Sequence, residues 1–160
     1  MKRTFLTATI VSVILFACSG NQGDSKPAES AGTSETPTTS TGAPAYDPER
    51  GEGKFKDVVV PETLDPALAA AGEKVYSMKC ASCHKLTDER LVGPGWKGVT
   101  LRNSAAWIMN FTTNPDVMLD KDPKAQAQLE ICLVRMPNQN LNDNETREVY
   151  EFMRQNDGVK

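Results

Sequence analysis

The chain has 160 residues, with 18 Lys and Arg against 21 Asp and Glu, which gives a formal net charge of −3. Charges of both signs are interspersed, and no basic stripe indicates a nucleic-acid partner. Residues 1–57 have compositions that cannot build a core, so the folded domain is expected over residues 58–160. A domain of about 100 residues is small, and a large apolar cofactor would add core material to it.

The N-terminal residues have the layout of a secretory signal peptide. Two positive charges in the first three residues precede a short apolar run that ends at Ala17. A transmembrane helix needs about 20 apolar residues, so we predict a signal peptide over residues 1–17. Leu15 to Cys18 resembles the lipobox of bacterial lipoproteins, which implies acylation of Cys18 and a membrane anchor. The alternative is that Cys18 merely lies near an ordinary cleavage site.

Residues 18–57 are rich in Ser, Thr, Gly, Pro, Ala and Glu. Such a composition cannot offset the entropy of ordering, so we predict a disordered, flexible linker. Its root-mean-square reach would be roughly 35 Å. A spacer with no required length fits the same composition.

The first predicted helix begins at Asp65-Pro66, where Asp65 is the expected N-cap and Pro66 the first helical residue. Leu68, Gly72 and Val75 then recur at helical spacing. The helix is expected to lead directly to the only histidine of the chain, His84.

Cys80-Ala81-Ser82-Cys83-His84 is the pattern of covalent haem attachment. The two thiols of Cys80 and Cys83 would bind the haem vinyl groups, and the His84 imidazole would bind the iron. Two residues between the cysteines place the sulfur atoms about one helical turn apart, next to one haem edge. The motif therefore predicts one covalently attached haem c.

Three other readings of these cysteines remain open. A thioredoxin-type dithiol would need a βαβ pattern, and the surrounding residues look helical and loop-like. A zinc site using Cys80, Cys83, Cys132 and His84 is chemically allowed, although adjacent ligands have an awkward geometry. A disulfide between Cys80 and Cys83 would suit exported thiols.

Three more helices are expected after a glycine-rich loop over residues 91–98. Ser104 would cap a helix that ends at Asn114-Pro115, and Asp122-Pro123 would begin the next one. Cys132 falls on the apolar face of that helix and is expected to fill the core. Asn142 and Glu145 form a capping-box pattern at the start of the closing helix.

From about residue 61 to residue 157 the sequence resembles class I c-type cytochromes. The resemblance implies an all-α fold of about four helices around one haem. It implies that Gly72 permits a close crossing with the C-terminal helix, where Tyr76 supplies an aromatic side chain. It also implies that the Pro94 carbonyl accepts a hydrogen bond from the His84 ring.

The second iron ligand cannot be another histidine of this chain. Met136 is the strongest candidate because Pro137 biases it away from helix and into a loop. In the related cytochromes the axial methionine commonly lies in such a Met-Pro segment before the last helix. Met118, in an expected turn, and a vacant or different site are the alternatives. Arg102, Trp96 and Trp107 are weaker candidates for binding the haem propionates.

These observations predict an electron carrier and not an enzyme, located in the periplasm or otherwise outside the cytoplasmic membrane. The expected partners are a quinol-cytochrome c reductase type donor and a terminal oxidase or periplasmic reductase as acceptor. One alternative is an open-site haem protein that binds a peroxide or a diatomic gas. A module without haem, with disulfide-bonded thiols, is the other.

Overall fold

A computed structural model describes residues 46–160 of the chain. The expected signal peptide, Cys18 and linker residues 18–45 lie outside the described residues. The described part contains six helices: α1 (Pro66–Lys79), α2 (Val99–Arg102), α3 (Ala105–Thr113), α4 (Pro115–Lys121), α5 (Pro123–Cys132) and α6 (Asp143–Asn156). Within this part there is no strand, only an isolated bridge between His84 and Arg90. The predicted all-α class is therefore confirmed.

The number of helices exceeds the expected four because two short helices, α2 and α4, lie between the longer ones. Pro115 begins α4 directly after α3 ends, so Met118 lies in a helix and not in a turn. None of the helices over residues 46–160 is long and apolar enough to span a membrane.

The predicted helix starts are confirmed by their capping hydrogen bonds. The Asp65 carboxylate accepts from the first amides of α1, and Ser104 Oγ accepts from Trp107 N at the start of α3. The Asp122 carboxylate caps α5 in the same way. Asn142 and Glu145 exchange both bonds of a capping box at α6. Each cap satisfies amides that no helical carbonyl can reach.

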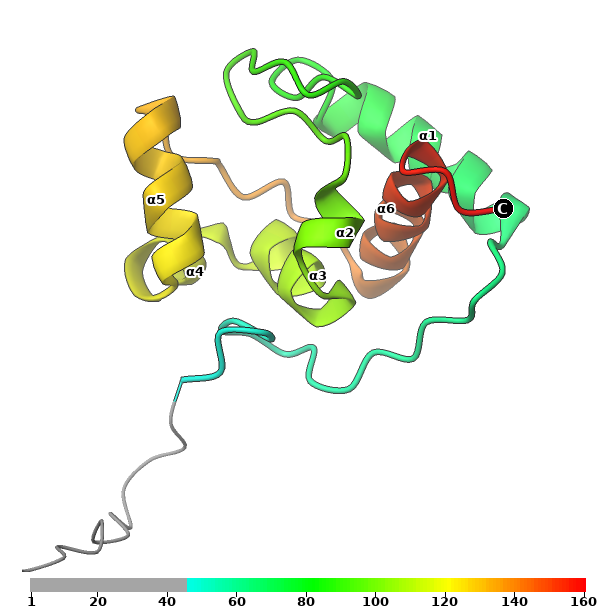
Figure 1. Ribbon diagram of the computed structural model, residues 1–160, viewed down its shortest axis with the longest axis horizontal. Coiled ribbons are helices and arrows are strands. Elements are labelled where there is room, and N and C mark those ends of the chain that lie inside the picture. The colour runs from blue at the N-terminus through cyan, green and yellow to red at the C-terminus, as the bar shows by residue number, and fades with distance from the viewer. Residues whose placement is uncertain (1–45) are drawn as a thin grey trace, which may run out of the picture. The chain divides into compact units, whose positions relative to one another are not determined.

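Helices α1 and α6 lie side by side at one end of the fold, and α4 and α5 lie at the other, with α2 and α3 between them (Figure 1). Gly72 makes the α1–α6 crossing close, because a Cβ there would stand 2.0 Å from the Glu148 carbonyl oxygen. Tyr76 of α1 packs against Phe152 of α6, with ring centroids 5.4 Å apart. These contacts place the end of α1, and the motif that follows it, against the core.

The folded part begins earlier than the expected boundary at residue 58. Residues 46–57 form an irregular segment of turns and bends that lies along the domain, here called the N-terminal strap (Figure 1). The buried Asn110 amide donates to the carbonyls of Arg50 and Phe55 and accepts from Phe55 N. Tyr46 Oη donates to the Asp122 carboxylate. The polar composition of the strap is compatible with order because side chains of the domain satisfy its backbone groups.

Candidate functional site

The two motif cysteines lie in a tight turn directly after α1. Cys80 N donates to Tyr76 O, and the amides of Cys83 and His84 both donate to Cys80 O at 3.0 Å. Cys80 is buried and Cys83 is half-buried, and both thiols are free. Burial raises the pKa of the Cys80 thiol to about 11, so it is neutral at pH 7. The turn thus presents two thiols and the imidazole from five consecutive residues.

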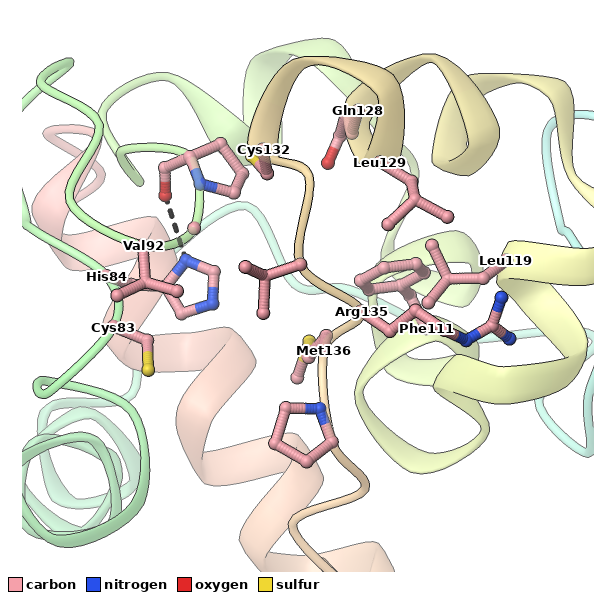
Figure 2. Close-up of a pocket in the computed structure, with 14 residues that line it drawn as sticks. Cys83, His84, Val92, Phe111, Leu119, Gln128, Leu129, Cys132, Arg135 and Met136 are labelled. Carbon is pink, nitrogen blue, oxygen red and sulfur yellow. Dashed lines mark hydrogen bonds between the residues drawn. The ribbon is translucent and has the colours of Figure 1, made fainter.

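The His84 ring is held by the loop that faces it. Its Nδ1 lies 2.9 Å from the carbonyl oxygen of Pro94 (Figure 2). A carbonyl only accepts, so Nδ1 carries the proton and Nε2 keeps its lone pair. Burial lowers the pKa of His84 below its ordinary value, and the hydrogen bond to Pro94 partly opposes that shift. Neutral imidazole with a free Nε2 is the form that binds a metal ion.

The loop before Pro94 folds back over the motif. The amides of Val92 and Gly93 both donate to the carbonyl of Cys83, at 3.2 and 2.9 Å. A Cβ on Gly93 would stand 2.3 Å from His84 Cε1, so only glycine lets the loop approach the imidazole this closely. Tyr76 Oη donates to the His84 carbonyl at 2.7 Å and fixes the backbone of the histidine. Sequence reasoning missed Gly93 as a site residue, although a glycine just before Pro94 was a visible signal.

His84 and Met136 line the same cavity, which has a volume of about 310 Å³ (Figure 2). Met136 lies in the segment between α5 and α6 and is half-buried. The walls are mostly apolar side chains from α3, α4, α5 and the two loops: Val92, Phe111, Leu119, Leu129, Val134 and Pro137. The cavity therefore joins the His84 imidazole, the Met136 thioether and the thiols of Cys83 and Cys132 in mostly apolar surroundings.

The other methionines are placed differently. Met118 is fully buried in α4, and its Sδ accepts from Glu52 N at 3.0 Å. Met78 is 74% exposed on α1. Met109 and Met153 are buried in helices α3 and α6. Of the methionines within residues 46–160, Met136 alone lines the cavity of about 310 Å³.

Cys132 is not a core residue. It is half-buried at the end of α5 and lines the cavity. Ala125 is the residue of α5 that is buried. The zinc reading has no ligand set, because no three His, Cys, Asp or Glu side chains gather for a metal ion in the part of the chain from residue 46 onward.

The three residues considered for the haem propionates, Arg102, Trp96 and Trp107, all line a second, smaller cavity together with His84 and Met136. Trp107 Nε1 donates to Asp122 Oδ2 at 2.9 Å, and Arg102 donates to the carbonyl of Lys97 at 2.7 Å. Trp96 is buried beside His84, with ring centroids 5.6 Å apart.

The donor set fits a covalently attached haem. Two free thiols stand one turn apart, the adjacent His84 keeps Nε2 available, and the carbonyl of Pro94 orients its ring. An iron-bound histidine commonly donates its other ring N–H to a backbone carbonyl, as His84 does here. The apolar cavity beside these groups suits the macrocycle.

Comparison with known proteins agrees with this chemistry. A sequence model of the family "Cytochrome c" matches residues 69–157. A solved cytochrome c from Rhodothermus marinus is 33% identical, with a TM-score of 0.63 over 66% of this chain and 90% of that chain. An engineered cytochrome c from the same organism, Rma TDE, is 32% identical, with a TM-score of 0.66 over 69% of this chain and 98% of that chain.

The same engineered protein bound to a carbene intermediate is 33% identical, with a TM-score of 0.63 and coverage of 69% and 98%. A comparison with curated proteins found no match. The family match covers more than half of the chain and includes Cys80, Cys83 and His84. The chain belongs to the cytochrome c family, and this membership implies haem-based electron transfer.

Proposed function

We propose that this chain is a one-electron carrier whose haem c is held by Cys80 and Cys83 and ligated by His84 and Met136. The observation that carries the proposal is the shared cavity of His84 and Met136, with the Cys83 thiol on its wall. When bound, the haem supplies the redox chemistry, since its iron alternates between the ferric and ferrous states.

Each surrounding residue has a distinct role in this proposal. The carbonyl of Pro94 orients the His84 ring and raises its basicity through the bond to Nδ1. The Met136 thioether favours ferrous iron and thereby raises the reduction potential. Phe111, Leu119 and Leu129 exclude water from the cavity, which disfavours the more highly charged ferric state.

Covalent attachment is tested by denaturing the protein after export with a c-type maturation system. Thioether bonds survive denaturation, so haem stain should stay with the denatured wild-type band. Loss of the stain from that band would contradict the central proposal. Replacing both Cys80 and Cys83 with alanine should abolish the stain.

The distal ligand is tested with Met136→Ala. The variant should keep its covalent haem, bind carbon monoxide when reduced, lose the sulfur-to-iron charge-transfer band and show a lower potential. Met78→Ala is the matched control, because Met78 is exposed and lies outside the cavity. Met118→Leu keeps the core filled and should also leave the spectrum unchanged. An unchanged spectrum in Met136→Ala would show that another group, and not Met136, is the second iron ligand.

An open-site haem protein is the second candidate, because one similar structure is an engineered cytochrome c described as bound to a carbene intermediate. A protein of this fold can therefore hold a small ligand. Rapid carbon monoxide binding by the reduced wild type would favour this candidate over the carrier.

We further propose that Cys18 is acylated and that the haem domain works outside the cytoplasmic membrane. The support is the lipobox-like sequence from Leu15 to Cys18 after a short apolar run. Cys18→Ala should release the cytochrome from the membrane fraction or leave it unprocessed, and labelled fatty acid should no longer enter it. Equal labelling of the variant and the wild type would contradict the anchor.

The proposed partners are respiratory proteins: a quinol-cytochrome c reductase type donor and a terminal oxidase or periplasmic reductase as acceptor. A linker between the anchor and the haem domain would let the domain move between two membrane-bound partners. Oxidation of the reduced protein by membranes of the source cell, blocked by an inhibitor of the acceptor, would test this assignment.

A further inference from the structure

A buried carboxylate lies behind the wall of the smaller cavity. Asp122 has no exposed surface. Its oxygens accept from Tyr46 Oη, from Trp107 Nε1 at 2.9 Å and from Ala125 N at 2.7 Å. A protonated carboxyl group would need an acceptor for its own hydrogen, and this one is surrounded by donors. The contacts therefore fit the ionised form of Asp122.

The Asp122 carboxylate has no cation as a partner. It forms no ion pair within residues 46–160. The nearest lysines in sequence contact the strap instead: Lys121 pairs with Glu52 at 3.7 Å, and Lys124 pairs with Glu49 at 3.4 Å. Because neutral donors alone hold the Asp122 charge in the interior, its field is only weakly screened.

Stability alone does not account for a carboxylate at this position. Asp122 caps α5, but Asn and Ser cap helices about as well as Asp. The chain uses both of them, with Ser104 at α3 and Asn142 at α6. A neutral cap would avoid the cost of removing a charge from water. The role of the residue as a cap therefore leaves its negative charge unexplained.

The hydrogen bond from Trp107 connects this charge to the cofactor site. The Trp107 side chain lines the smaller cavity together with His84 and Met136. It also stacks on Phe111, with ring centroids 5.2 Å apart, and Phe111 lines both cavities. Only one hydrogen-bonded side chain thus links the Asp122 carboxylate to the cavity wall.

We propose that the buried charge of Asp122 lowers the reduction potential of the haem. This inference rests on the proposed electron-carrier function. Ferric haem carries one positive charge more than ferrous haem, so a nearby negative charge stabilises the ferric state. Through about 10 Å of protein, one unit charge changes such an equilibrium on the order of tenfold. The Asp122 charge opposes the Met136 thioether and the apolar walls, which favour the ferrous state.

The test is a mediated redox titration of the haem-loaded full chain in solution. Asp122→Asn should change the ferrous-to-ferric ratio at a fixed ambient potential about tenfold toward ferrous haem, which is about 59 mV for a one-electron couple. The difference from the wild type should persist in about 1 M salt, because salt screens exposed charges and not buried ones. Asp122→Ser, a second neutral cap, should change the ratio in the same direction. Both variants should keep the wild-type visible spectrum.

Asp65→Asn is the matched control. Asp65 caps α1 and precedes Pro66, as Asp122 caps α5 and precedes Pro123, but Asp65 is exposed. The control should leave the potential unchanged. The proposal would be overturned by equal changes in Asp65→Asn and Asp122→Asn, by a difference that vanishes in salt, or by no change in Asp122→Asn.

Two further variants separate the charge from the hydrogen bonds around it. Trp107→Phe and Tyr46→Phe each remove one donor and keep the carboxylate. Neither variant should change the ratio toward ferrous haem. A change toward ferrous haem in either one, as large as in Asp122→Asn, would show that side-chain positions and not the charge set the potential.

Failure of this inference can be told apart from failure of the proposed function. Absence of a reversible haem signal in the wild-type titration would contradict the electron carrier itself. A normal wild-type titration with the same potential in Asp122→Asn would contradict the role of Asp122 alone.

Discussion

The carbonyl oxygen of Glu148 in α6 lies 2.0 Å from the position that a Cβ on Gly72 of α1 would occupy. Alanine at this position would favour the isolated helix by up to about 1 kcal/mol. The obstacle is backbone, however, and forcing the helices apart costs about 1–3 kcal/mol or more. We therefore expect Gly72→Ala to destabilise the haem-loaded protein by up to about 2 kcal/mol in guanidinium unfolding, the difference between these two effects.

The exposed neighbour Glu73 provides the control for this helix. Glu73→Ala should change the free energy of unfolding by no more than about 0.5 kcal/mol. A Gly72→Ala variant as stable as the wild type would show that α1 and α6 can move apart without loss of unfolding free energy.

The loop glycine at position 93 has a similar role beside the imidazole. Alanine at Gly93 would place its Cβ 2.3 Å from His84 Cε1, so the ring or the loop must move. We expect a lower yield of haem-loaded protein and a changed visible spectrum, because the bond from His84 Nδ1 to Pro94 is disturbed. Absorption spectra and reduction potentials measure the effect.

Gly158→Ala separates local strain from an effect on the haem. Gly158 also has a positive φ, of 93°, but a Cβ there would meet nothing within 4 Å. This control should lose some stability and keep the wild-type spectrum. An identical spectrum in Gly93→Ala would contradict the close approach to His84.

The helix starts were predictable because their signals are local. A cap such as Asp65, Ser104 or Asn142 acts on amides two or three residues away, so the sequence alone identifies it. The cavity wall was not predictable, since Leu129 and Val134 come to line the same cavity as His84 only through tertiary packing. Met136 could be singled out because proline follows it and no second histidine exists.

The N-terminal strap was missed for a different reason. Composition reports which side chains can form a core, and those of residues 46–57 are mostly polar. The strap is held largely through its backbone: Asn110 binds the carbonyls of Arg50 and Phe55, and Met118 Sδ accepts from Glu52 N. Hydrogen bonds to backbone groups do not depend on the side chains of the segment, so its amino-acid composition does not predict them.

The buried Asp122 carboxylate connects the strap to the cavity wall. It accepts from Tyr46 Oη, from Trp107 Nε1 at 2.9 Å and from Ala125 N at 2.7 Å. Trp107 in turn stacks on Phe111, which lines the cavity. Asp122→Ala would remove the cap of α5, at about 1 kcal/mol, and leave a buried indole N–H unpaired, at about 1–3 kcal/mol. We expect a total loss of about 2–4 kcal/mol in unfolding free energy.

Tyr46→Phe removes only one of these bonds. Burial and the Asp122 charge raise the pKa of Tyr46, so its hydroxyl remains a donor at neutral pH. The variant should lose only about 0.5–1.5 kcal/mol. If Tyr46→Phe and Asp122→Ala lost the same unfolding free energy, Asp122 would stabilise the protein only through its hydrogen bond to the strap.

The acid stability of the α1–α6 contact should depend on Glu145. Its carboxylate accepts from Asn142 N within the capping box and from Lys79 Nζ of α1 at 3.0 Å. These bonds, that to Asn142 first, lower the pKa of Glu145 below its ordinary value of 4.5. The folded state therefore holds the proton less tightly than the unfolded state. The stabilisation is fully present above pH 4.5 and is lost as the pH falls through the lower folded pKa.

Glu145→Gln keeps a side chain that can complete the capping box but cannot titrate. Unfolding free energies of the haem-loaded proteins, measured at pH 7 and again below pH 4, should therefore fall less with acid in Glu145→Gln than in the wild type. Lys79→Ala should give an intermediate dependence, because the bond to Asn142 still lowers the pKa of Glu145. If Glu145→Gln and the wild type lost the same stability between the two pH values, another group would account for the acid sensitivity of this helix pair.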